Sequence, residues 1–178
     1  LDTENGLPEN NVRNVIMLPN GLVCIQTPTV LNLYNGATCE SFRFDPSRVP
    51  YSEYAGMNRT QYDALENSLW CSSASRHWIF NLDTHEFDYD IGTWLAGYGI
   101  TGEEIDQIFF TEKGNCYFTT PGNTFHICDR QNKSVLSLNL PRQMSGPVVF
   151  RKDGEFLWLL SREGMLARFD LSLNSFVS

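Results

Sequence analysis

Two short segments carry the residue types that could bind a small molecule, because both combine aromatic rings with polar side chains. The first is Arg76-His77-Trp78, and the second is the stretch 93–99, which contains Trp94 and Tyr98. Aromatic faces stack on the C–H surfaces of sugars, and neighbouring polar groups fix the orientation of hydroxyl groups. Alternatively, Trp78 and Trp94 cover the hydrophobic core. We predict ligand-binding candidates at Arg76, His77, Trp78, Trp94 and Tyr98, which need not form one site.

Catalytic chemistry has little support in the sequence. The three histidines, His77, His85 and His126, are scattered, and no serine sits in a glycine-flanked nucleophile elbow. The acidic group Glu103-Glu104-Asp106 lacks the spaced oxygen ligands of a calcium loop, and no Cys/His cluster has zinc spacing. We therefore predict a non-enzymatic segment with no metal and no cofactor.

The net charge also limits the classes of partner. The chain carries a formal charge of −8, with an isoelectric point near 4.8. Nucleic-acid binding needs clustered Lys and Arg, so we expect no nucleic-acid partner. No apolar run approaches the roughly 20 residues of a membrane helix, and the segment begins with no signal-peptide pattern. Contact with a membrane is expected only through parts of a longer parent protein.

Five cysteines, at positions 24, 39, 71, 116 and 128, leave the redox compartment undecided. A hairpin centred on Gly122 would place Cys116 opposite Cys128, at a separation compatible with a disulfide. The alternative is a pair of buried thiols that behave as small hydrophobic side chains.

A pattern repeated four times predicts the elements that position these residues. The copies are centred on Cys24, Trp70, Tyr117 and Trp158, which are 46, 47 and 41 residues apart. A period in the forties, filled with short strands, is typical of a β-propeller or a β-solenoid.

Each repeat contains four strand-like segments separated by turns rich in Gly, Asn, Asp and Pro. We predict an all-β fold: a β-propeller segment of about four four-stranded antiparallel blades, at residues 6–46, 54–92, 103–141 and 146–178. The run Phe156–Leu160 is apolar throughout, which predicts that both faces of this strand are covered. A central strand of a larger sandwich is the alternative.

The first repeat resembles a known family. It contains Gly6-Leu7-Pro8 within the segment 3–15, then Asn20-Gly21, a strand ending at Thr27, and Tyr34-Asn35-Gly36. This order is similar to the regulator-propeller repeat: a Gly-Leu-Pro turn, a Gly turn, a Trp-Ile-Gly-Thr strand and a Tyr-Asp-Gly. Cys24 replaces the family's Trp and Gln26 replaces its Gly. The other three repeats match more loosely, so the resemblance covers almost the whole chain.

The resemblance implies a function. Regulator propellers form the periplasmic sensor region of bacterial hybrid two-component histidine kinases, which control transcription through a phosphorelay. By this resemblance the chain is the periplasmic part of an inner-membrane protein, with oligosaccharides as expected ligands. A non-catalytic interaction or dimerisation scaffold and a fragment of a propeller enzyme are the alternatives.

The number of repeats raises a physical difficulty, because relatives of this family have about seven blades. An open arc of four would leave apolar faces on its first and last blades. We expect either self-association through these open blade faces or a longer ring, of which this chain is a part.

Overall fold

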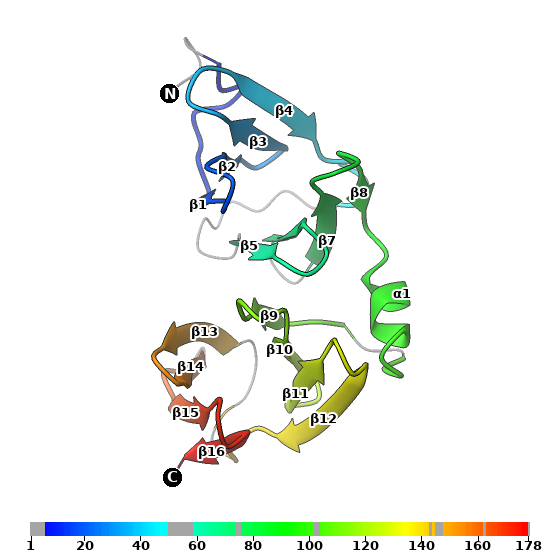
Figure 1. The fold of residues 1–178 in the computed structure, drawn as a ribbon. Helices are drawn as coiled ribbons and strands as arrows, with labels where there is room; N and C mark the ends of the chain where they lie inside the picture. Colours follow the sequence, from blue (N-terminus) through cyan, green and yellow to red (C-terminus); the bar gives the residue numbers. More distant parts are fainter. Residues whose placement is uncertain are drawn as a thin grey trace. The chain divides into compact units, whose positions relative to one another are not determined.

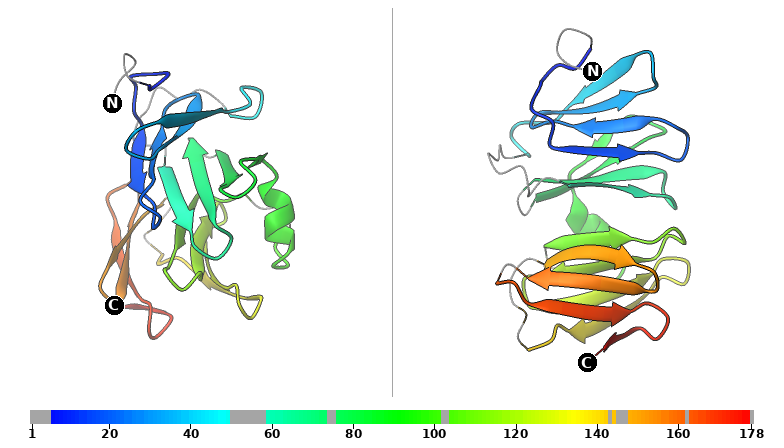
Figure 2. Two further views of the ribbon diagram at one scale, coloured as in Figure 1. Left: turned by 45° about the horizontal axis from the view of Figure 1, so that its top comes forward. Right: turned by 90° about the vertical axis from the view of Figure 1, so that its left-hand side faces the viewer.

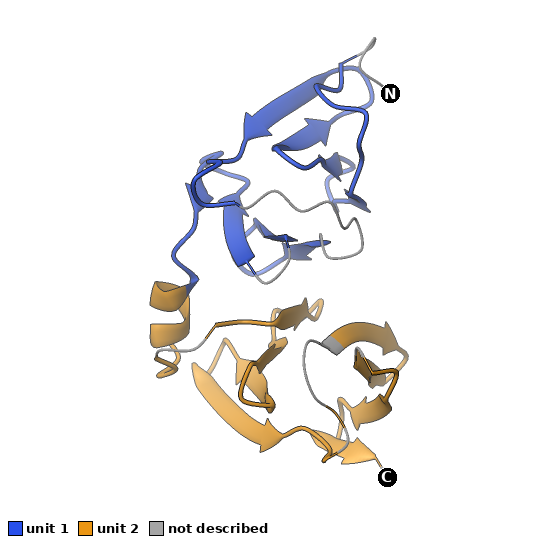
Figure 3. Ribbon diagram, turned by 180° about the vertical axis from the view of Figure 1, so that it is seen from behind, with its two compact units in different colours: residues 1–91 blue, residues 92–178 orange. Residues whose placement is uncertain are grey.

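The computed structural model describes residues 6–49, 59–73, 76–101, 104–142, 144, 148–161 and 163–177. The predicted blade limits at residues 54, 103, 146 and 178 lie outside these residues, as does Glu103. The chain divides into two compact units, residues 1–91 and residues 92–178, which are described separately below (Figure 3).

The predicted fold class is confirmed. The described residues form four four-stranded antiparallel sheets, each with its strands in sequence order (Figure 1). Unit 1 holds two of these blades. Blade 1 consists of β1 (Asn14–Met17), β2 (Val23–Gln26), β3 (Val30–Tyr34) and β4 (Cys39–Arg43), and blade 2 of β5 (Arg59–Asp63), β6 (Ser68–Ser73), β7 (Arg76–Asn81) and β8 (Phe87–Asp88).

Unit 2 holds the other two blades. Blade 3 consists of β9 (Gln107–Phe110), β10 (Cys116–Thr120), β11 (Thr124–Asp129) and β12 (Ser134–Asn139). Blade 4 consists of β13 (Val148–Asp153), β14 (Phe156–Ser161), β15 (Leu166–Asp170) and β16 (Ser175–Val177). Figure 2 shows the strands of blade 4 running side by side.

A short helix, α1 (Ile91–Ala96), follows β8 in the chain, where the all-β prediction included no helix. Its last turn is closed by bonds from the N–H groups of Tyr98 and Ile100 to the carbonyl oxygen of Leu95, at 2.9 and 3.1 Å. No helix among the described residues is long and apolar enough to cross a membrane.

The turns between the first two strands of the blades need a residue with positive φ. Gly21, Gly114 and Gly154 take this position, with φ values of +84°, +83° and +56°. In blade 2 the corresponding turn uses Asn67, with φ of +45°. Asn is the residue besides Gly that tolerates this conformation best, so the same turn forms there without a glycine.

Face-to-face packing of blades builds the core of each unit. In unit 1, Cys24, Leu31 and Leu33 of blade 1 pack with Leu69, Cys71, Trp78 and Phe80 of blade 2. In unit 2, Tyr117, Phe125 and Ile127 of blade 3 pack with Phe150, Leu157, Leu159 and Phe169 of blade 4. Alternate residues of each strand supply one face of a sheet, so the strand pattern alone selects which side chains enter these layers.

A buried amide links the two blades of unit 1. The Gln26 side chain is 1% exposed, and its Nε2 donates to the carbonyl oxygen of Ser72 at 3.3 Å. Its Oε1 accepts a bond from the Thr60 hydroxyl at 2.6 Å. Thr60 and Ser72 belong to neighbouring strands of blade 2, so one side chain of blade 1 satisfies two buried polar groups of its neighbour.

Blade 4 differs from the prediction for Phe156–Leu160. Leu157 and Leu159 are buried against blade 3, but the other face of β14 is open and Leu160 is 44% exposed. The prediction that both faces are covered was therefore wrong, because the described residues cover only one face of this sheet. Arg168 lies across the open face, 4.6 Å from the ring centroid of Phe156 and 5.7 Å from that of Trp158.

The strand register places Cys116 opposite Cys128, as the sequence predicted. Both thiols are buried and form no disulfide, so the structure has the second of the two alternatives. A hydrogen bond from Cys116 lowers the pKa of the Cys128 thiol, whereas burial raises the pKa of Cys24 to about 12. Cys24 and Cys71 both lie in the core of unit 1, where they act as small hydrophobic residues.

The Gln26 bridge leads to a first prediction. A Gln26→Leu variant keeps the approximate size of the side chain but leaves the Thr60 hydroxyl and the Ser72 carbonyl without their partner. We expect the free energy of unfolding in urea to fall by about 1–3 kcal/mol. Gln131→Leu is the matched control, because Gln131 is exposed between β11 and β12, and its effect should stay within about 0.5 kcal/mol. Equal effects of the two substitutions would contradict the bridge.

Candidate functional site: a basic cavity in unit 1

A cavity of about 320 Å³ lies between the loop that follows β4, the start of β7 and the segment that follows β8. All three segments belong to unit 1. The described residues that line it are Pro46, Ser47, Arg48, Arg76, His77 and Tyr89. Its volume lies at the lower end of the range of small-molecule pockets.

A compact turn after β4 presents one wall of the cavity. The Asp45 carboxylate accepts bonds from the backbone N–H of Ser47 at 2.9 Å and from its hydroxyl at 2.7 Å. The backbone N–H groups of Arg48 and Val49 then close the turn on the Asp45 carbonyl oxygen, each at 3.0 Å. Asp followed by Pro favours such a turn, because Asp accepts local bonds and Pro fixes φ. The bonds from Ser47, with a smaller contribution from Arg48, lower the pKa of Asp45.

Aromatic packing holds this turn against blade 2. Phe44, the residue before the turn, is buried with its ring 5.0 Å from that of Trp78 and 5.5 Å from that of Phe87. The backbone N–H of Asp45 donates to the Tyr89 hydroxyl at 2.9 Å. The turn of blade 1 and the end of blade 2 are thus fixed to each other beside the cavity.

The first group of predicted binding residues divides between the cavity and the core. Arg76 and His77 line the cavity, with Arg76 exposed and His77 half-buried. Trp78 is 1% exposed and packs within the core of unit 1. Trp78 therefore supports the strand that carries the two polar residues, and its own ring faces are used for packing.

The cavity is rich in hydrogen-bond donors. Arg48 and Arg76 each carry a planar guanidinium, and the imidazole of His77 adds a further N–H. Burial raises the pKa of Tyr89, so its phenol stays protonated and can donate as well. None of the described lining residues is acidic. Such a set suits a ligand that offers acceptor oxygens, charged or neutral.

The second group of predicted residues lies in unit 2 around a buried arginine. Arg130, which is 4% exposed, places its guanidinium carbon 5.9 Å from the Trp94 ring and 5.6 Å from the Phe110 ring. Its Nε donates to the Tyr98 hydroxyl at 3.4 Å, and the Trp94 and Tyr98 rings are 4.7 Å apart. Through Arg130, Trp94 and Tyr98 thus connect α1 and the residues after it to blade 3. These contacts stabilise the packing of this segment.

Sequence reasoning missed Arg48, Ser47, Pro46 and Tyr89 in unit 1 and Arg130 in unit 2. The signal that could have found Arg48 is the Asp-Pro-Ser-Arg turn directly after the last strand of blade 1. Among the described residues, no group of three or more His, Cys, Asp or Glu side chains could hold a metal ion.

No family model and no curated protein matches this sequence. Several solved structures match its fold. The extracellular domain of BT3049 from B. thetaiotaomicron, described as a hybrid two-component system, matches 99% of this chain with a TM-score of 0.66 and 16% identity. Two structures of the extracellular domain of BT4673 from the same organism, described as a one-component and as a hybrid two-component system, match 99% and 97% of the chain. Their TM-scores are 0.54 and 0.55, with 12% and 13% identity.

The chain has the fold of these extracellular domains. It spans only 25% of the BT3049 structure and 30–31% of the two BT4673 structures, so it corresponds to a part of each. They come from the class of protein with which the sequence resemblance was drawn.

The contacts of Trp94 predict a role in stability. Trp94→Ala removes the ring that packs on Arg130, Tyr98 and Phe118. We expect it to lower the free energy of unfolding by about 2 kcal/mol or more, measured by urea denaturation. Trp94→Phe keeps a ring over the guanidinium and should recover most of the loss. Unchanged stability of Trp94→Ala, together with lost affinity for a bound sugar, would instead support the prediction that Trp94 binds a ligand.

Proposed function

We propose that this chain is part of the extracytoplasmic ligand-sensing propeller of a hybrid two-component sensor histidine kinase. The fold match to extracellular domains over 97–99% of the chain carries this proposal. The sequence repeat supports it, since the Gly6-Leu7-Pro8 frame of the first blade resembles regulator-propeller repeats. In this proposal the segment is periplasmic, and its parent is anchored in the inner membrane.

The segment itself binds rather than catalyses. Its cavity in unit 1 offers donors from Arg48, Arg76, His77 and Tyr89, which suit the oxygen-rich surface of an oligosaccharide. Binding biases the parent between two signalling states, because a ligand shifts a conformational equilibrium by its difference in affinity for the two states. The kinase, the phosphorelay and the control of transcription belong to the rest of the parent.

The parent protein in its host provides the test. We expect its gene to encode a membrane helix and a kinase core after this segment, and its target genes to respond to an oligosaccharide panel. Deletion of the propeller from the parent should abolish that response, whereas the kinase core alone should retain autophosphorylation in membrane vesicles. A parent without a kinase core, or one with clustered catalytic carboxylates in a second propeller, would overturn the proposal.

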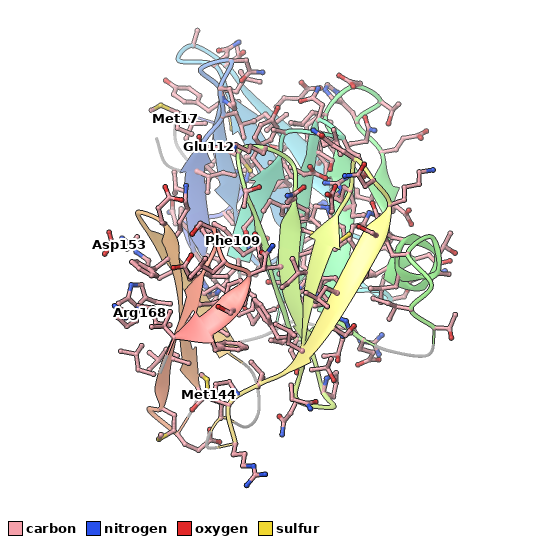
Figure 4. The ribbon with its side chains drawn as sticks, turned by 60° about the horizontal axis from the view of Figure 1, so that its bottom comes forward. Met17, Phe109, Glu112, Met144, Asp153 and Arg168 are labelled. Carbon is pink, nitrogen blue, oxygen red and sulfur yellow. The ribbon has the colours of Figure 1, made fainter. Side chains whose placement is uncertain are left out.

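The open face of blade 4 favours a second candidate, a scaffold in which two copies of the chain associate. This face combines Leu160 and Leu166, which are 44% and 60% exposed, with the half-buried rings of Phe156 and Trp158. Figure 4 shows Arg168 and Asp153 on the same side of this blade, so the face carries both charges as well as apolar area. A second copy would remove the exposed apolar area from water.

Light scattering coupled to size-exclusion chromatography tests this association on the 178-residue chain. We expect a dimer for the wild type and a monomer for Leu160→Glu. Association would bury the new carboxylate on this face without a partner, and the cost of removing that charge from water destabilises the dimer. Leu136→Glu is the matched control, since Leu136 is 49% exposed on β12 of blade 3. A monomeric wild type would remove this candidate and favour a longer ring, in which a further blade covers the face.

A further inference from the structure

We infer that the cavity of unit 1 selects acidic oligosaccharides by binding the carboxylate of a uronic-acid unit. This inference rests on the proposed function and narrows its ligand class. It starts from the charge of the cavity, which differs from that of the chain. The chain as a whole has 21 acidic and 13 basic residues, yet two arginines and a histidine meet at this one cavity.

The two guanidinium groups come from separate segments that the fold brings together. Arg48 belongs to the turn after β4, and Arg76 is the first residue of β7. A guanidinium presents paired N–H donors that match the two oxygens of a carboxylate, so Arg forms stronger and more directional contacts with it than Lys does. Two such groups lining one cavity favour an anion over a neutral hydroxyl group.

The Asp45 carboxylate, which lies beside the cavity, does not take the place of the ligand. Asp45 lies next to the cavity, but its side-chain oxygen Oδ1 already accepts both bonds from Ser47 within the turn. The bonds from Ser47 hold the pKa of Asp45 below its usual value and keep it charged, and attraction to Arg48 contributes less than these bonds. Arg76 comes from β7, lines the cavity and is exposed, so a ligand can reach its charge.

The remaining lining residues suit the sugar that carries the acid. The Tyr89 hydroxyl accepts the Asp45 N–H through its oxygen, so its own proton can be donated to a sugar hydroxyl. Pro46 and the Tyr89 ring present apolar surface to sugar C–H groups, and His77 lines the same cavity. A volume of about 320 Å³ suits the end unit of an oligosaccharide better than an internal stretch.

Isothermal titration of the 178-residue chain tests the inference with four probes. These are trigalacturonic acid, a trisaccharide ending in glucuronic acid, a neutral galactose trisaccharide and sodium sulfate. We expect at least one uronate to bind at least ten-fold more tightly than the neutral sugar and than sulfate. Arg76→Gln and Arg48→Gln should each weaken that binding at least ten-fold, and Arg76→Lys should have an intermediate effect.

Arg43→Gln is the matched control, because Arg43 is an exposed arginine of β4 outside the cavity. Circular dichroism of every variant checks that the fold is kept, which is expected since Arg48 and Arg76 are exposed. Equal affinity for the neutral trisaccharide, tighter binding of sulfate, no binding of either uronate, or equal effects of Arg43→Gln and Arg76→Gln would each overturn the inference.

The response of the parent separates this inference from the proposed function. A parent that signals to a neutral oligosaccharide, and is unaffected by Arg76→Gln, keeps the sensor function and overturns the acidic ligand class. A chain that binds uronates through Arg76 in a parent without a kinase core keeps the binding site and overturns the sensor function.

Discussion

The packing of one four-stranded sheet on the next is the constraint on which the rest of the structure depends. Each unit consists of two blades whose facing sides share one hydrophobic layer, around Leu31, Leu69 and Phe80 in unit 1 and around Phe125, Leu157 and Phe169 in unit 2. A single four-stranded sheet has two faces and little core of its own, so each blade needs a neighbour. Blade 4 shows the consequence of this requirement: among the described residues only one of its faces is packed on a neighbour, and apolar side chains stay exposed on the other.

Local signals explain how much of the fold could be predicted from the sequence. Turn residues such as Gly21 and Gly154, and the hairpin that pairs Cys116 with Cys128, depend on residues close together in the chain. The prediction for Phe156–Leu160 failed because an apolar run does not reveal whether a neighbour exists on each side. The helix α1 was missed because it is only six residues long and its contacts, through Trp94 and Arg130, come from the tertiary fold.

The difference between local sequence signals and contacts formed only in the tertiary fold also applies to the candidate site and to Gln26. Arg76 and His77 could be predicted because they stand together, but Arg48 and Tyr89 join them only when blade 1 packs on blade 2. Gln26 stands where the regulator-propeller repeat, which the sequence resembles, has a glycine, and it has a similar explanation. Its amide bonds to Thr60 and Ser72, 34 and 46 residues away, so the reason for this residue lies in the neighbouring blade.

Burial separates the residues that support the cavity from those that a ligand can contact. Phe44 and Trp78 lie in the core and fix the distance between the turn and β7, so substitutions there change the whole unit. Ser47, Arg48 and Arg76 are exposed, and changing them removes little apolar packing. A scaffold of this kind can therefore acquire a different ligand preference through two or three exposed positions while its blades stay packed. Because the cavity joins two blades, a ligand that bridges Arg48 and Arg76 also stabilises the contact between them, by an amount that rises with the logarithm of ligand concentration over Kd.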